Sequence, residues 1–187
     1  TCDWLATQGF LAVCPDLFWR IEPGIQITDK TDAEWKRAFE LFGLFDVDKG
    51  IEDMNTTLAE LRAHEACNGK AGSVGYCLGG KLAYLMATRS DSDANVGYYG
   101  VGLGELLGEA GNITKPLMLH IAEKDGFSSP EEIETVKNGL AANSKATVHV
   151  YEGQDHAFAR LGGEHYNEAA ATLANGRTLN FFKEHLA

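Results

Sequence analysis

Short apolar runs alternate with longer amphipathic stretches along the chain, and this alternation predicts its architecture. Each run is bounded by residues that favour turns and is short enough for a strand, so we expect buried strands at residues 10–16, 70–75, 94–99, 116–122 and 146–151. The stretches between the runs place apolar side chains at the three- and four-residue spacing of a helix face. Strands that alternate with helices are typical of an α/β fold, in which helices flank a mostly parallel sheet.

Residues that start and stop helices refine this prediction. Residues 1–8 have the pattern of the tail of a helix, closed by Gly9. Between residues 31 and 64 the helical spacing is interrupted once, which predicts two helices with Asp46 or Asp48 capping the second. We find no repeat, low-complexity tract or linker, and therefore expect residues 1–187 to form a single domain. Further helices are predicted at residues 78–88, 131–143 and 166–185.

Composition places the chain among ordinary globular proteins and excludes several functions. Hydrophobic residues make up 44% of the sequence and charged residues 23%. The formal net charge of −11 argues against a nucleic-acid or anionic membrane partner, because both require clustered Lys and Arg. A small anionic substrate stays possible, since one or two arginines can dominate a pocket. No apolar run approaches the roughly 18 residues of a membrane span, and no signal-peptide pattern opens the chain.

The four cysteines are widely scattered and form no Cys-x-x-Cys pair. A structural zinc site, a thioredoxin-like redox site and a disulfide framework are therefore not expected. Free thiols fit a reducing compartment, so we expect a cytoplasmic protein that needs no metal and no organic cofactor. A monomer is the simplest expectation for its oligomeric state. The four residues are Cys2, Cys14, Cys67 and Cys77.

One cysteine lies where a predicted strand gives way to a helix. Residues 75–80, Gly-Tyr-Cys-Leu-Gly-Gly, match the nucleophile-elbow pattern Gly-x-Ser-x-Gly with Cys77 in place of serine. Such a turn projects the nucleophile from a strained backbone, and the helix N-terminus favours the thiolate over the thiol. It also aims the N–H of Leu78 at a developing oxyanion. The alternative is an ordinary tight turn around a small buried thiol.

An acid and a base follow the nucleophile in the order used by α/β-hydrolases. Asp125 comes directly after the predicted strand at residues 116–122, and His156 comes after the strand at residues 146–151. The carboxyl ends of parallel strands share one edge of a sheet, so both side chains are expected near Cys77. His156 would activate the sulfur and transfer protons, and Asp125 would orient the imidazole.

Other residues compete for these roles. Glu123 and Asp155 are rival acids, although Asp155 adjoins the histidine and would have to bend back to reach its ring. Asp125 followed by glycine is also common in plain turns, and single loop histidines are commonly surface residues. The remaining histidines are expected on strands (His120 and His149) or on helix faces (His64, His165 and His185).

At this point the sequence resembles the dienelactone hydrolase (carboxymethylenebutenolidase) family. The resemblance covers nearly the whole chain in the same order, and a cysteine elbow followed closely by Gly-Tyr-Tyr-Gly is a specific combination. It is carried by residues 16–20 (Asp-Leu-Phe-Trp-Arg), 75–80, 97–100 (Gly-Tyr-Tyr-Gly), 156–160 (His-Ala-Phe-Ala-Arg) and 173–179 (Leu-Ala-Asn-Gly-Arg-Thr-Leu).

The resemblance implies an α/β-hydrolase fold and a Cys–Asp–His triad made of Cys77, Asp125 and His156. It also implies that Arg20 and Arg160 bind a substrate carboxylate, a role that suits the forked guanidinium. Tyr98 or Tyr99, at the end of the third predicted strand, would shape the pocket, and we favour Tyr99.

Two features differ from the family pattern. The N-terminal strands of the family, with a Glu that contacts the resting nucleophile and a loop that supplies a second oxyanion N–H, do not occur in these residues. We therefore expect a domain that is incomplete at its N-terminus. Ala157 also stands where family members can carry a polar side chain.

The sequence thus predicts a hydrolase that opens the enol-lactone ring of a dienelactone-like carboxylate through an acyl-enzyme. The resemblance implies a maleylacetate-type product, formed during the degradation of aromatic compounds. One alternative is a broader carboxylesterase or thioesterase of the same fold. Another is a non-catalytic thiol sensor or binding module on a hydrolase scaffold.

Overall fold

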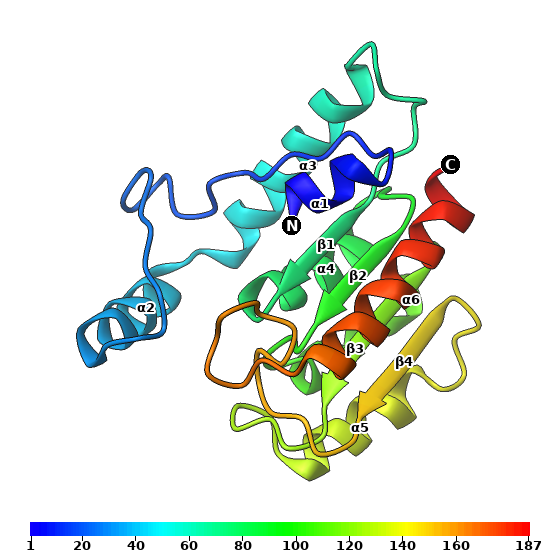
Figure 1. Ribbon diagram of the computed structural model, residues 1–187. Helices are drawn as coiled ribbons and strands as arrows, with labels where there is room; N and C mark the ends of the chain where they lie inside the picture. Colours follow the sequence, from blue (N-terminus) through cyan, green and yellow to red (C-terminus); the bar gives the residue numbers. More distant parts are fainter.

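Four parallel strands form the centre of the molecule in a computed structural model that describes residues 1–187 (Figure 1). The strands lie side by side in chain order and each pairs in parallel with the next. All their carboxyl ends therefore meet at one edge of the sheet. The strands are β1 (Ser73–Tyr76), β2 (Asn95–Tyr98), β3 (Leu117–Ala122) and β4 (Ala146–Tyr151).

Helices cover both faces of this sheet, as the α/β prediction required (Figure 1). On one face lie α3 (Val47–Ala63), α4 (Leu78–Arg89) and α5 (Pro130–Leu140), together with the 3₁₀ helix η1 (Gly104–Asn112). On the other face lie α1 (Cys2–Thr7) and α6 (Glu168–Leu186). Helix α2 (Asp32–Leu44) stands to the side of the sheet.

The side chains of β3 contribute to the apolar clusters on both faces of the sheet. Leu117, Leu119 and Ile121 belong to the cluster under α3, α4 and α5, whereas Met118 and Ala122 belong to the cluster under α1 and α6. The side chains of a strand alternate between its two faces, and every residue of β3 is buried. A run that is apolar except for His120 is the signature of this central strand.

The predicted helix ends are confirmed where a polar side chain caps them. The Asp46 side chain accepts a hydrogen bond from the N–H of Lys49 at 3.1 Å, so it and not Asp48 begins α3. Ser129 caps α5 in the same way, with Pro130 in its first turn. None of the helices combines the length and the apolarity that crossing a bilayer requires.

The predicted strand at residues 10–16 is wrong. This segment is not paired with any strand and runs across the face that carries α6, where Phe10 contacts Phe182 edge-on with ring centroids 6.1 Å apart. The segment resembles a strand in sequence because its side chains alternate between two sides: Phe10 and Ala12 pack inward, while Leu11 and Val13 are exposed. Helix η1 was not predicted, and Tyr166 lies before the start of α6.

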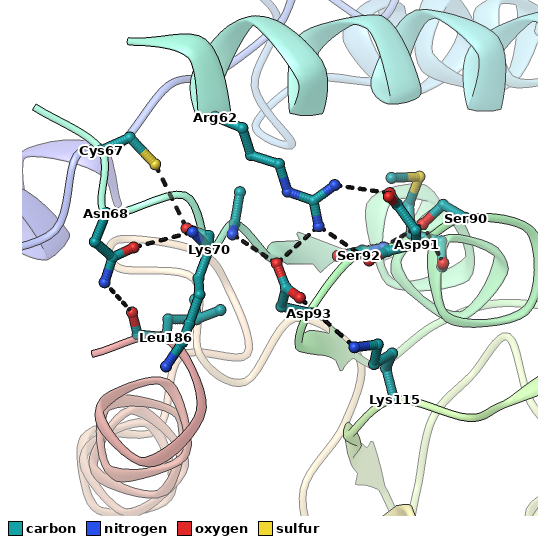
Figure 2. A network of polar contacts seen from close by, with 12 residues as sticks. Arg62, Cys67, Asn68, Lys70, Ser90, Asp91, Ser92, Asp93, Lys115 and Leu186 are labelled. Atoms are coloured by element: carbon teal, nitrogen blue, oxygen red, sulfur yellow. Dashed lines mark hydrogen bonds and ion pairs between the residues drawn. The ribbon is translucent and has the colours of Figure 1, made fainter. Parts of the chain in front are cut away.

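At the amino ends of the strands a polar network joins α3 to the sheet (Figure 2). Arg62, in the last turn of α3, donates to Asp91 at 2.8 Å and to Asp93 at 2.7 Å. Asp93 also accepts the N–H of Ala71 at 3.0 Å. The candidate site is found at the carboxyl ends of the strands, so the network lies at the opposite edge of the sheet.

Candidate active site

Cys77 occupies the turn between β1 and α4, in a conformation that few non-glycine residues adopt. Its φ is 56° and its ψ is −115°, and it is the residue that precedes the first turn of α4. This positive φ is the backbone strain expected of a nucleophile elbow. The N–H of Cys77 donates to the carbonyl oxygen of Tyr98 at 3.0 Å, which ties the turn to β2.

Glycines allow the strand and helix to meet at this turn. A Cβ atom on Gly75 would lie 1.9 Å from the carbonyl oxygen of Gly79, and one on Gly80 would lie 2.5 Å from that of Tyr98. A Cβ atom on Gly79 would meet nothing within 4 Å. The close approach therefore requires Gly75 and Gly80, whereas Gly79 supplies only its backbone.

Asp125 and His156 form a buried pair at the same edge of the sheet. The Nδ1 atom of His156 lies 2.9 Å from both carboxylate oxygens of Asp125, and their side chains are only 8% and 2% exposed. Nδ1 is the donor, since an ionised carboxylate can only accept. This leaves Nε2 as the ring nitrogen available for proton transfer.

The electrostatics of His156 connect it to the cysteine. Burial by itself would lower the pKa of the imidazole, but hydrogen bonds with Asp125 and Cys77 and the charges of both groups raise the pKa to about 9. The structure thus brings Cys77, Asp125 and His156 together from three separate loops. At neutral pH this environment favours an imidazolium beside the sulfur.

The two rival acids are occupied elsewhere. An Asp155 oxygen accepts the backbone N–H of His156 at 2.6 Å, and a Glu123 oxygen accepts that of Gly153 at 2.8 Å. Neither carboxylate makes a hydrogen bond with the His156 ring, which Asp125 alone engages among the acids considered.

Leu78 and Tyr99 both lie beside this group. Leu78 is the first residue of α4, so its N–H is one of the helix donors without an acceptor in the preceding turn. Tyr99 follows β2 with a φ of 37°, is buried, and contacts the His156 ring edge-on at a centroid distance of 5.0 Å. Burial raises the pKa of its phenol, so the hydroxyl stays protonated at neutral pH.

The two arginines make contacts with carboxylates of the protein. Arg20 donates to both oxygens of Asp53 in α3, at 3.0 and 2.7 Å, and stacks on Trp19. Arg160 lies 3.2 Å from Asp29. Arg160 lies four residues after His156, on the same loop after β4. No contact joins Arg20 to the group around Cys77.

An aromatic cluster, formed by Trp35, Phe39 and Phe127, adjoins the site and was missed by sequence reasoning. The Phe127 ring contacts the ring of His156 edge-on at 4.6 Å. Trp35 and Phe39 of α2 lie 6.5 and 6.3 Å from Phe127, and all three side chains are exposed. The helical spacing of Trp35 and Phe39 predicted only a helix, and the structure places their side chains beside a candidate catalytic residue.

His165 was also misplaced in the sequence interpretation. It precedes α6 instead of lying on its face, and its Nδ1 atom is 3.1 Å from the carbonyl oxygen of His156. No sequence pattern links these residues, because the contact depends on how the loop after β4 folds back on itself.

The family model of the dienelactone hydrolase family matches residues 1–186. The chain belongs to this family. A protein of Azospirillum brasilense named as a candidate carboxymethylenebutenolidase is 56% identical over 188 residues, which cover 99% of this chain and 80% of that protein. The carboxymethylenebutenolidase of Pseudomonas putida is 39% identical over 181 residues, covering 97% and 77% of the two chains.

A solved structure agrees with this assignment. The crystal structure of a candidate dienelactone hydrolase from Klebsiella pneumoniae superposes with a TM-score of 0.86 at 26% identity, over 98% of this chain and 79% of that one. As a dienelactone hydrolase family member, the chain is a lactone or ester hydrolase with the α/β-hydrolase fold. A small ester or lactone is accordingly its class of substrate.

Proposed function

We propose that the protein hydrolyses its substrate through an acyl-enzyme on Cys77. The thiolate attacks the carbonyl carbon, a carbon–sulfur bond forms, and the carbon–oxygen bond of the ester or lactone breaks. His156 supplies a proton to the leaving oxygen and then removes one from the attacking water. Water adds to the thioester carbonyl, the sulfur leaves as thiolate, and the carboxylic acid is released.

The backbone supports the charged intermediate of both steps. The N–H of Leu78 lies at the start of α4, where the helix dipole favours negative charge, and is the proposed oxyanion donor. Asp125 holds Nδ1 of His156 so that Nε2 faces the reaction. The observation that carries the proposal is the buried hydrogen bond between His156 and Asp125, together with the strained backbone of Cys77 at a helix N-terminus.

Removal of the sulfur tests the mechanism directly. Cys77→Ala should abolish turnover of an aryl ester and of a dienelactone, while Cys67→Ala, which removes a thiol that donates only to Lys70, should leave turnover intact. Rapid quenching of the wild-type protein followed by mass spectrometry should detect the acyl adduct on Cys77. Full turnover by the Cys77→Ala protein would refute the mechanism and favour a sensor or binding role for the thiol.

For the substrate we propose a dienelactone-like carboxylate, bound by Arg20 and Arg160. Each guanidinium would exchange its present carboxylate partner, Asp53 or Asp29, for that of the substrate. Arg160→Gln and Arg20→Gln should then raise the KM of an anionic lactone while leaving that of a neutral ester unchanged. Equal effects on both substrates would contradict the anionic assignment. We further propose that the protein acts in the degradation of aromatic compounds. It would do so in the cytoplasm and as a monomer.

The aromatic cluster favours a second candidate, a broader carboxylesterase that accepts apolar or aromatic esters. Phe127 touches His156, and Trp35 and Phe39 extend this apolar surface outward. Burying an aryl group against such a surface contributes on the order of 25 cal/mol per Å². Phe127→Ala should reduce kcat/KM for a phenyl ester more than for an acetate ester of a small alcohol. Equal losses for the two esters would contradict this candidate.

A further inference from the structure

Two neighbouring loops carry the acid and the base, and the side chain of Asp155 is one of the groups that join them. The loop after β3 carries Asp125 and the loop after β4 carries His156. The carboxylate oxygen Oδ1 of Asp155 accepts the backbone N–H of His156 at 2.6 Å and the backbone N–H of Gly126 at 3.2 Å. Each of these N–H groups belongs to a candidate triad residue or to its immediate neighbour.

We propose that Asp155 is a positioning residue, which holds the loops of Asp125 and His156 at the separation that their hydrogen bond requires. The inference rests on the proposed function, in which those two residues act as a pair. Asp155 itself touches neither the sulfur of Cys77 nor the His156 ring, so its effect passes through the backbone. This role accounts for an acid at position 155, next to His156, that does not bind the His156 ring.

The backbone after His156 needs such support. Ala157 has a φ of 62°, a conformation that costs a non-glycine residue on the order of 1 kcal/mol. Strained residues persist where the surrounding bonds determine their position. Here the N–H of His156 is held by Asp155, and the carbonyl oxygen of Ala157 accepts the N–H of Arg160 at 2.8 Å.

His165 acts on the other side of the same residue. Its Nδ1 atom lies 3.1 Å from the carbonyl oxygen of His156 and must donate, since a carbonyl can only accept. Its Nε2 atom lies 3.8 Å from the second oxygen of Asp155. The main chain of His156 is therefore held at its N–H by Asp155 and at its carbonyl oxygen by His165. The side chains of Asp155 and His165 also lie next to each other.

The carboxylate of Asp155 is well suited to this role. Partial burial would raise its pKa, but the N–H groups of His156 and Gly126 and the nearby histidines lower it overall. The group is consequently ionised at neutral pH and accepts strong, charge-assisted hydrogen bonds.

Removal and conservative replacement of the carboxylate provide the test. Asp155→Ala should lower kcat for an aryl ester by about 10- to 100-fold with little change in KM, because displacing a catalytic group by about 1 Å costs rate rather than binding. Asp155→Asn keeps the Oδ1 acceptor and should recover most of that kcat. The pKa of His156, followed by NMR, should fall from about 9 in both variants because the carboxylate charge is lost, and it should fall further in Asp155→Ala, where the hydrogen bond with Asp125 is disturbed as well.

The chain offers a matched control in Glu123, whose carboxylate also bridges the two loops but contacts Gly153 instead of the triad. Glu123→Ala should leave kcat and the His156 pKa nearly unchanged. The inference is overturned if Asp155→Ala retains the wild-type kcat and His156 pKa, if Asp155→Asn is as impaired as Asp155→Ala, or if Glu123→Ala is equally impaired. A wild-type protein without ester turnover would refute the proposed function, and the NMR readout would still test the role of Asp155.

Discussion

His156 lies between an acid and a sulfur, and its charge state depends on both. Its pKa is raised from an ordinary value of roughly 6.5 to about 9, because the hydrogen bonds with Asp125 and Cys77 outweigh the effect of burial. A raised pKa means that the folded state holds the proton more tightly. The resulting stabilisation is fully present below pH 6.5 and is lost as the pH rises through about 9.

Asp125→Asn tests this balance at the residue scale. The neutral amide no longer stabilises the imidazolium and can present an N–H to Nδ1, which selects the wrong tautomer. We expect kcat to fall by about 10⁴-fold, as for the equivalent change in a serine triad, and the His156 pKa to fall toward 6.5. Steady-state kinetics and NMR titration of the imidazole measure the two effects.

The control is Asp48→Asn, which removes a carboxylate that is 83% exposed and pairs with Arg89 away from the site. It should change neither quantity. An Asp125→Asn protein whose imidazole still titrates near pH 9 would show that Cys77 alone sets the charge of His156.

Cys77, Asp125 and His156 could be singled out from the sequence because each residue follows a recognisable strand. The position of Asp125 after a strand and before a glycine favoured it over Glu123 and Asp155, but all three lie on the same pair of loops and the sequence does not show which way each carboxylate points. The structure separates them by orientation: one carboxylate faces the ring and two face backbone N–H groups. Such orientation depends on loop conformation, which has no periodic signal.

At the scale of elements, the junction of β1 and α4 is set by the space available between backbones. A Cβ atom at Gly75 would overlap the carbonyl oxygen of Gly79, whereas one at Gly79 would meet nothing within 4 Å. The elbow pattern alone suggests equal importance for the two glycines. The structure instead shows that a side chain fits at Gly79 but not at Gly75.

Gly75→Ala should therefore disrupt the turn, whereas Gly79→Ala should be tolerated. For Gly75→Ala we expect a loss of stability of about 3 kcal/mol or more together with loss of Cys77 reactivity, because the strand and helix must move apart. Gly79→Ala should lie within about 1 kcal/mol of the wild type, since alanine also favours the helix. Thermal unfolding and the rate of alkylation by iodoacetamide measure both. Equal destabilisation by the two substitutions would contradict this account.

The elements themselves were largely predictable, and the exceptions have a physical cause. The largely apolar run of β3 and the caps of α3 and α5 are local features that the sequence displays directly. Residues 10–16 show the same local alternation, but strand formation requires a paired neighbour, and the segment packs on α6 without one. Helix η1 is short, contains three glycines, which disfavour a helix, and has no fully buried residue.

At the scale of the whole molecule, the two edges of the sheet serve different purposes. The carboxyl ends carry the candidate active site, and the amino ends carry the polar network of Arg62, Asp91 and Asp93 (Figure 2). This network joins α3 to the segments that enter β1 and β2. A change there should affect stability and leave catalysis intact, because the length of the sheet separates the two regions.

Arg62→Ala tests this separation. The Arg62 side chain is 22% exposed and donates to two carboxylates and a carbonyl oxygen, so its removal leaves Asp93 partly buried with only the Ala71 N–H and the more distant Lys115. We expect a loss of about 2 kcal/mol, equivalent to roughly 4–8 °C in Tm for a chain of this size, with kcat unchanged. Arg37→Ala, which removes an arginine paired with two exposed carboxylates of its own region, should cost less than about 1 kcal/mol.

The pH dependence of this loss identifies its origin. Burial would raise the pKa of Asp93, but Arg62, the N–H of Ala71 and Lys115 together lower it. A lowered pKa stabilises the fold above the unfolded value of roughly 3.9, and that stabilisation disappears as the pH falls through the folded value. The difference in Tm between wild type and Arg62→Ala should thus be constant near neutrality and shrink below about pH 4. A difference that persists undiminished at pH 3 would mean that Arg62 stabilises the molecule through packing of its side chain and not through the charge of Asp93.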